Sequence, residues 1–200
     1  VSQQSVRERL ADYVALTKPR LSTMSVMTAV FGYLAALPQW SWQTFAAVCI
    51  GSAVAAGGAA ALNMWLERGP DARMRRTADR PLAAGRLRAF EVAVVGLTLS
   101  ALGVVVLWFG ATPLAGLFAG ATVLLYAGAY TPLKRLSLQA TEVGAVAGAL
   151  PPLIGWAAAG SPDWALGAYL FAILFLWQIP HFMSISWIYR EDYQRGGFAM

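Results

Sequence analysis

Long apolar stretches, separated by short polar or charged breaks, form the main pattern along this chain. A bilayer core about 30 Å thick needs roughly 20 apolar residues for each helical span. Six stretches of suitable length predict membrane-spanning helices at about residues 21–37, 44–66, 91–109, 113–130, 142–159 and 165–188. Strands are a poor alternative, because the stretches do not alternate and an open sheet would leave backbone groups unpaired in lipid. The predicted fold class is therefore all-α, a polytopic transmembrane helix bundle with six spans.

Prolines inside or beside these stretches predict local irregularities. A proline within a helix removes one backbone hydrogen bond and clashes with the preceding turn. Pro151 and Pro152 are expected to break the fifth span, and Pro180 is expected to kink the sixth. Pro70, just after the second span, is expected to bend or restart the helix, so that Asp71 lies on a separate segment.

Composition agrees with a membrane location. Hydrophobic residues make up 58% of the 200 residues, and charged residues only 12%. An ordinary soluble domain carries about a quarter charged residues, so this class of protein is excluded. Residues 1–20, which carry mixed charges, are expected to form a cytoplasmic amino-terminal segment, and residues 21–200 a transmembrane domain.

The positive charges orient the predicted bundle. All 15 Lys and Arg residues fall on four segments that share one side of a six-span chain whose amino terminus is inside. They are Arg7, Arg9, Lys18 and Arg20; Arg68, Arg73, Arg75, Arg76, Arg80, Arg86 and Arg88; Lys134 and Arg135; Arg190 and Arg195. The opposite loops, near residues 38–43, 110–112 and 160–164, contain none. The positive-inside rule makes the basic side cytoplasmic, and because topology accounts for the net charge of +5, no nucleic-acid partner is predicted.

A first acidic cluster follows the second span. Asn63, Glu67 and Asp71 are spaced i, i+4, i+8, which on a continuous helix places three oxygen ligands on one stripe. Mg²⁺ is commonly held by one or two carboxylates together with substrate phosphate oxygens and water. Arginines follow at once along the chain, and they suit bidentate phosphate contacts. The spacing alone leaves two interpretations open: a magnesium diphosphate site, or a solvated and salt-bridged interfacial loop.

A second acidic pair, Glu191 and Asp192, follows the sixth span. Four spans separate it from the first cluster, and an even number of spans returns the chain to the same membrane face. Both clusters can therefore converge on one cavity, where carboxylates and metal neutralise a diphosphate leaving group. A juxtamembrane segment with a few unrelated charges is the simpler alternative.

Three further polar residues lie at the cytoplasmic ends of spans. Lys134 can bind phosphate as a point charge and Tyr130 can donate a hydrogen bond to it, although both also fit a positive-inside flank with an interfacial tyrosine. His181, the only histidine, lies near the end of the sixth span. An ionisable residue at that depth is a functional candidate, and a histidine hydrogen-bonded to a neighbouring helix is the competing interpretation.

Taken together, several segments resemble the UbiA-type intramembrane prenyltransferases and, among them, the haem O synthase (protoheme IX farnesyltransferase) branch. The matching segments are Leu16-Thr-Lys-Pro-Arg20, Asn63-Met-Trp-Leu-Glu-Arg-Gly-Pro-Asp71, Met74-Arg-Arg-Thr-Ala-Asp-Arg-Pro-Leu-Ala-Ala-Gly-Arg86, Tyr130-Thr-Pro-Leu-Lys-Arg135, Gly148-Ala-Leu-Pro-Pro-Leu-Ile-Gly-Trp156, Trp177-Gln-Ile-Pro-His-Phe182 and Tyr189-Arg-Glu-Asp-Tyr193. The acidic motifs indicate the superfamily, whereas Pro-Pro-Leu-Ile-Gly-Trp and Pro-His-Phe point to the haem branch. The resemblance implies a bundle of about nine helices around a cytoplasmic cavity, of which this prenyltransferase domain would be carboxy-terminally incomplete.

The resemblance also implies roles for individual residues. Catalysis and metal binding would fall to two motifs, Asn63, Glu67 and Asp71 in the first and Glu191 and Asp192 in the second, with Mg²⁺ on Asn63, Glu67, Asp71 and Asp192. Diphosphate would be held by Arg75, Arg76, Arg80, Tyr130 and Lys134, and His181 would line the haem or acceptor pocket. Departures from the family pattern are Glu67 in place of aspartate, Gly69-Pro70 before Asp71, and Ala140 where an asparagine is expected.

The implied reaction transfers a farnesyl group from farnesyl diphosphate to a vinyl group of haem b, giving haem O for terminal oxidase assembly. Its implied partners are both substrates, substrate-bound Mg²⁺, the lipid bilayer of the bacterial inner membrane, and the enzyme that converts haem O to haem A. Three alternatives stay open. They are a UbiA-type enzyme with an aromatic, quinone-precursor or chlorin acceptor, a transporter with broken helices, and a structural membrane subunit.

Overall fold

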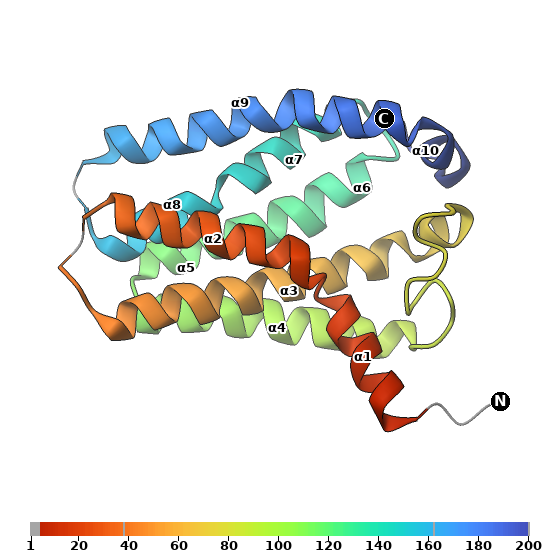
Figure 1. Cartoon of the computed structure of the whole chain (residues 1–200), viewed down its shortest axis with the longest axis horizontal. Helices are drawn as coiled ribbons and strands as arrows, with labels where there is room; N and C mark the ends of the chain where they lie inside the picture. The colour runs from red at the N-terminus through yellow and green to blue at the C-terminus, as the bar shows by residue number, and fades with distance from the viewer. Residues whose placement is uncertain (1–4, 38, 162, 200) are drawn as a thin grey trace.

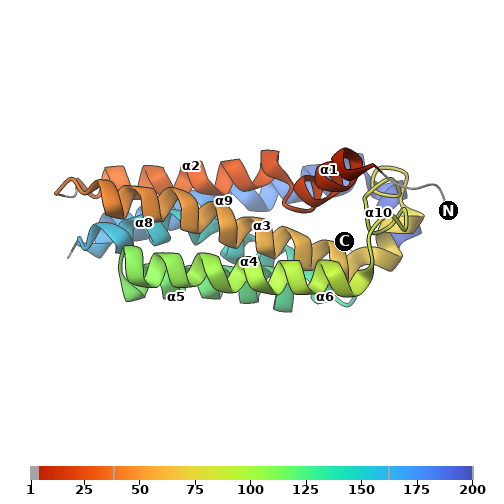
Figure 2. The ribbon, with the colours of Figure 1, turned by 90° about the horizontal axis from the view of Figure 1, so that it is seen from below.

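The protein is a bundle whose long helices lie side by side along one axis, while the first helix slants away from that axis (Figures 1 and 2). The structure is a computed structural model that describes residues 5–37, 39–161 and 163–199. All regular elements within these ranges are helical, which confirms the predicted all-α class. Residues 1–4 of the predicted amino-terminal segment, and residues 38 and 162 in two predicted loops, lie outside the described residues.

Eleven helical elements follow one another in the described ranges. They are α1 (Val6–Leu16), α2 (Pro19–Ala35), α3 (Trp42–Arg73), α4 (Ala89–Gly110), α5 (Pro113–Val123), the π-helix η1 (Leu124–Tyr130), α6 (Thr131–Leu133), α7 (Ala140–Ala149), α8 (Pro151–Ala159), α9 (Trp164–Ile188) and α10 (Arg190–Gly196). The loop between α3 and α4 lies at the same end of the bundle as α1 and α10 (Figure 1).

Five helical segments of the described chain are long and apolar enough to cross a membrane. They are α3, α4, the continuous α5–η1–α6, the pair α7 and α8, and α9, and they correspond to predicted spans two to six. The predicted first span corresponds to α2, whose 17 residues make it shorter than the other five. At 1.5 Å per residue it is about 25 Å long, and it lies alongside α3 and α8 in the bundle.

The prolines have different effects from one helix to the next. Pro151 and Pro152 begin α8 after a break at Leu150, which confirms the predicted interruption. The expectation that Asp71 lies on a separate segment after Pro70 is wrong, because α3 continues through Pro70 to Arg73. A proline this close to the helix end removes one backbone hydrogen bond while only one more turn follows, so the helix can continue. Helix α9 also contains Pro180 and ends at Ile188, and the kink expected at Pro180 stays a prediction.

At the end of the bundle opposite the basic segments, small residues let two helices approach each other closely. A Cβ atom added at Gly32 would collide with the backbone of Pro152, and one at Gly155 with the backbone of Ala29. Helices α2 and α8 therefore pack backbone against backbone. A buried core cluster surrounds this contact: Ala29, Tyr33, Val48, Leu107, Ala115, Ala119, Ile154, Ala157 and Ala158. This tight region closes one end of the bundle.

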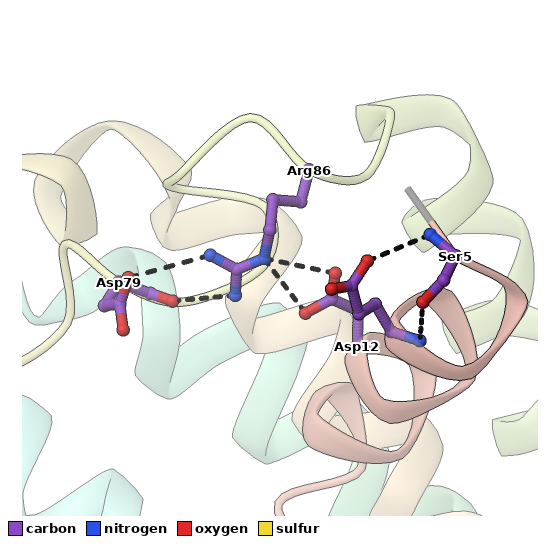
Figure 3. Close-up of polar contacts among 5 residues, drawn as sticks. Ser5, Asp12, Asp79 and Arg86 are labelled. Atoms are coloured by element: carbon purple, nitrogen blue, oxygen red, sulfur yellow. Dashed lines mark hydrogen bonds and ion pairs between the residues drawn. The ribbon is translucent and has the colours of Figure 1, made fainter. Parts of the chain in front are cut away.

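An ion-pair cluster fixes α1 against the loop between α3 and α4 (Figure 3). Arg86 Nε donates to both carboxylate oxygens of Asp12, at 3.0 and 3.1 Å, and Arg86 also contacts Asp79. Ser5 begins α1 with a capping box that includes Glu8. The cluster thereby orders the segment that leads into the first predicted span.

Candidate active site

A cavity of about 470 Å³ opens within the bundle, between the basic end and the closed end. Its wall combines residues of α2, α3, the α3–α4 loop, α5, η1, α7, α8, α9 and α10. One half of the wall is rich in charges, and the other consists mainly of small and apolar side chains with a few hydroxyl groups. A cavity with two chemically different halves suits a ligand that has a charged head and an apolar tail.

The acidic stripe on α3 faces this cavity. Because the helix is continuous through Pro70, the i, i+4, i+8 spacing places Asn63, Glu67 and Asp71 on one face. All three line the cavity, and they are only 1%, 5% and 1% exposed. Carboxylates are rarely buried so deeply without a partner, so the surrounding cations determine what this stripe can bind.

Two cations pair with the two carboxylates. Arg80 Nη1 lies 2.7 Å from Asp71 Oδ2, and the Lys134 ammonium group pairs with Glu67. Thr77 donates a hydrogen bond to the backbone carbonyl of Asp71 at 2.9 Å, which ties the loop to the end of α3. An anion that enters the cavity can compete for Arg80 and Lys134, because both cations already line it.

Lys18, which was not predicted as a site residue, provides a third cation. Its Nζ donates to Asn63 Oδ1 at 2.6 Å, and it lines the same cavity. The backbone of Lys18 is left-handed, with φ 45° and ψ 63°, a conformation that is costly for a non-glycine residue. Removal of the ammonium group from water, reinforced by repulsion from Arg80, lowers the pKa of Lys18 to about 7.

The π-helix η1 supplies the aromatic wall. Tyr126 and Tyr130 both line the cavity, with ring centroids 5.6 Å apart. Thr131 anchors this segment, since its hydroxyl donates to the Tyr126 carbonyl at 2.7 Å and accepts from Asn63 Nδ2 at 3.0 Å. Lys134 Nζ lies 4.6 Å from the centroid of the Tyr130 ring. π-helical turns are frequent at functional sites, and here one aligns two tyrosines with the acidic stripe.

The second acidic pair lies beside the cavity and lines a smaller hollow of about 320 Å³ together with Arg75. The Asp192 carboxylate accepts hydrogen bonds from the backbone N–H groups of Arg75 and Arg76, both at 3.2 Å. Glu191 is mostly exposed and pairs with Arg195. Of this region, Arg76 and Tyr193 reach the main cavity. Asp192 therefore orders the loop that presents Arg76.

His181 lies on α9, at an exposed edge of the cavity. Its ring stacks on Trp177, with centroids 4.7 Å apart and planes 16° from parallel. Leu21 and Met24 on α2 also line the cavity and are more than half exposed, as Trp177 is. Within the described residues, the exposed stretch of the cavity wall therefore lies between α2 and α9, at the level of His181.

The residues around Asp71 fit a metal ion that is shared with an anionic ligand. Asp71 Oδ1 is buried and has no hydrogen-bond partner, while Glu67 is the neighbouring carboxylate on the stripe. Within the described ranges, no three His, Cys, Asp or Glu side chains gather closely enough to hold a metal by themselves. This donor set matches Mg²⁺, which commonly takes one or two carboxylates and completes its shell with phosphate oxygens and water.

Comparison with known proteins agrees with this geometry. The model of the UbiA prenyltransferase family matches residues 25–200. The chain belongs to this family. The fold agrees as well: a UbiA homolog from Archaeoglobus fulgidus, solved bound to GPP and Mg²⁺, superimposes with a TM-score of 0.78 over 93% of this chain and 66% of that one, at 16% identity.

Several relatives in sequence share a name. A protoheme IX farnesyltransferase of Opitutus terrae is 50% identical over 192 residues, and one of Solibacter usitatus is 45% identical over 201 residues. The human mitochondrial protoheme IX farnesyltransferase is 40% identical over 187 residues, which are 92% of this chain and 42% of the human protein. The chain spans 65% of the length of the Opitutus relative and 69% of that of the Solibacter relative.

The sequence did not predict the two residues that hydrogen-bond to Asn63 and so link three helical segments of the site. Lys18 and Thr131 are joined through Asn63, which links the start of α2 to η1. Both residues lie inside the segments that resemble the family. Those segments contain several basic and hydroxyl residues, and the sequence does not distinguish Lys18 and Thr131 from the others. Their role depends on a backbone conformation and on contacts 45 and 68 residues apart along the chain, which spacing does not reveal.

Proposed function

We propose that the protein transfers the farnesyl group of farnesyl diphosphate to a vinyl group of haem b, giving haem O for terminal oxidase assembly. The observation that carries this proposal is the cavity itself, whose charged half contains two carboxylates and several cations and continues into an apolar half. Membership of the UbiA family and the shared name of the relatives support the same reaction.

The charged half would bind the diphosphate. Arg76, Arg80, Lys134 and Lys18 line it, and their charges would neutralise the departing diphosphate. Tyr130 would donate a hydrogen bond to the same group. Diphosphate binding would draw Arg80 and Lys134 from their carboxylate partners toward the ligand, and would leave those carboxylates free for a cation.

Mg²⁺ would be held by Asp71 and Glu67, with Asn63 beside them. When bound, the metal supplies positive charge that stabilises the leaving diphosphate. The predicted metal contact of Asp192 stays a prediction, because its carboxylate accepts hydrogen bonds from the Arg75 and Arg76 backbone in the structure. We propose that Asp192, and Glu191 with it, act by positioning the loop that carries Arg76.

The apolar half would hold the isoprenoid chain and exclude water from its reactive end. As the C1–oxygen bond breaks, its electron pair stays with the diphosphate. The vinyl π electrons of haem b then form the new carbon–carbon bond to C1. Water adds to the resulting cation beside the porphyrin ring and loses a proton, which gives the hydroxyethylfarnesyl group.

The acceptor would lie against the part of the cavity wall formed by α9. Trp177 and His181 stack there and offer a flat aromatic surface for a planar macrocycle. The distribution of positive charge supports an orientation in which the polar half faces the cytoplasm of a bacterial cell. Contact with the enzyme that consumes haem O stays a prediction from the resemblance.

A panel of acceptors tests the proposal. The whole protein in membranes would receive farnesyl diphosphate and Mg²⁺ with haem b, 4-hydroxybenzoate or a chlorophyllide, and products would be identified by mass spectrometry. We expect hydroxyethylfarnesyl haem from haem b and no product from the others. Conversion of 4-hydroxybenzoate without conversion of haem b would show that the acceptor is wrong while the prenyl transfer is right.

A further inference from the structure

The face of α3 that carries the acidic stripe continues, toward the closed end of the bundle, as a row of small residues. Ser52, Ala56, Ala59 and Ala60 line the same cavity as Asn63 and Glu67. From Asn63 to Ser52 the helix rises about 16 Å at 1.5 Å per residue, which is comparable to the length of an extended farnesyl chain. Small side chains on this face leave room for a chain to lie along the helix.

The small-residue face ends at a closed floor. One turn beyond Ser52 lies Val48, which is fully buried in the core cluster. Ala119 and Ile154 line the cavity and also belong to that cluster, so they form its boundary. Just beyond it, α2 and α8 meet backbone to backbone at Gly32 and Gly155, which leaves no space between these two helices.

The floor also contains an unusual polar atom. Ser52 is 4% exposed, its hydroxyl has no hydrogen-bond partner, and it lines the cavity. By contrast, the exposed lining residues Leu21 and Met24 lie in the first two turns of α2, near the charged half. Ser52 therefore lies at the buried end of the cavity, next to the core cluster, so an isoprenoid that follows α3 ends at this floor.

We propose that the floor formed by Ser52, Ala119 and Ile154 sets the longest isoprenoid that the protein accepts as donor. This inference rests on the proposed prenyl transfer and adds to it a chain-length limit encoded by residues of α3, α5 and α8. A diphosphate held by Lys134 and Arg80 fixes one end of the donor. The floor then limits the number of isoprene units that fit between the bound diphosphate and Ser52.

The test measures kcat/KM for geranyl, farnesyl and geranylgeranyl diphosphate with haem b, using the whole protein in membranes. Ser52→Phe should lower the ratio of farnesyl to geranyl use by roughly tenfold or more, because the larger side chain shortens an apolar pocket. Ala56→Phe, one turn nearer the charged half, should lower the ratio further. Ala53→Phe is the matched control, since Ala53 is exposed on another side of α3 and does not line the cavity, and its ratio should equal that of the wild type.

A second variant tests the opposite direction and does not depend on the bulkier substitutions being tolerated. Ile154→Val deepens the floor slightly and should raise the use of geranylgeranyl diphosphate relative to farnesyl diphosphate. Unchanged ratios in Ser52→Phe and Ile154→Val, alongside a wild-type protein that makes prenylated haem, would overturn the chain-length inference and leave the proposed function intact. A wild-type protein that transfers no prenyl group from any of the three donors would instead overturn the proposed function.

Discussion

At the scale of single residues, the candidate site is a set of buried charges whose partners come from distant parts of the chain. The acidic stripe was predictable, because i, i+4, i+8 spacing on a helix gives one face whatever surrounds it. The partner of each charge was not predictable from spacing. Lys18 reaches Asn63 only because its backbone adopts a left-handed conformation just before Pro19, where residues preceding proline favour extended geometry.

Lys134 and Arg135 offer a matched pair for testing charge at the site. Lys134 is buried against Glu67, whereas its neighbour Arg135 is exposed. Lys134→Met should lower kcat/KM for farnesyl diphosphate by roughly 10²-fold, because a cation at a developing negative charge is lost. Arg135→Met should stay within about twofold of the wild type. Steady-state kinetics on both variants checks this, and equal effects of the two substitutions would refute a specific role for Lys134.

At the scale of elements, the apolar pattern predicted the helices well, and the local geometry at prolines less well. The break before α8 was predicted. The continuity of α3 through Pro70 was not, and it is possible because the cost of one lost hydrogen bond near a helix end is small compared with the packing of its buried face. The π-helix η1 had no sequence signal. It depends on Thr131, whose hydroxyl caps a carbonyl five residues earlier and also contacts α3.

The anchoring of η1 can be tested by a substitution that preserves shape. Thr131→Val removes a buried hydroxyl that makes two hydrogen bonds, and the loss should destabilise the protein by about 1–3 kcal/mol. Thr122→Val is the control, since its hydroxyl bonds only a carbonyl of its own helix four residues earlier, and it should cost well under that amount. Thermal unfolding in detergent reports both, and equal melting temperatures for the two variants would argue against the anchor.

The contact between α2 and α8 permits a second test at this scale. Gly155→Ala should prevent stable folding, because the added methyl group collides with the Ala29 backbone, which cannot move without separating the helices. Gly120→Ala adds the same group where the nearest atom is 3.9 Å away, and it should be tolerated or slightly stabilising. Yield and melting temperature of the solubilised protein distinguish the two. Normal yield of Gly155→Ala would mean that the helices are not in backbone contact.

At the scale of the whole molecule, topology brings the charges together. The even number of spans between basic segments predicted that these segments share one membrane face. They do lie at one end of the bundle, where α1 and α10 are found together with the α3–α4 loop (Figure 1). Topology could not predict which of the acidic residues at that end face the cavity and which bind the neighbouring loop. Glu67 and Asp71 face the cavity, whereas Asp192 turns to the backbone of the neighbouring loop.

The orientation in the membrane that the same charges predict can be measured with single cysteines. In a Cys49→Ala background, Ser137→Cys lies at the basic end, between α6 and α7, and Ser161→Cys at the other end, between α8 and α9. An impermeant thiol reagent applied outside intact cells freed of their outer membrane should label Ser161→Cys alone. Ser137→Cys should react only after the membrane is opened. The reverse pattern would contradict the positive-inside assignment.

We expect the α3 carboxylates of the cavity to serve prenyl transfer, and a comparison of two aspartates tests this role most directly. Asp71 is buried beside Arg80, whereas Asp79, in the loop after α3, has a fully exposed side chain. Mass spectrometry would quantify prenylated haem made from farnesyl diphosphate, haem b and Mg²⁺ by membranes that contain equal amounts of folded variant. We predict that Asp71→Asn lowers product formation by roughly 10²-fold or more, and that Asp79→Asn retains wild-type activity. Wild-type product formation by folded Asp71→Asn would show that Asp71 does not serve prenyl transfer.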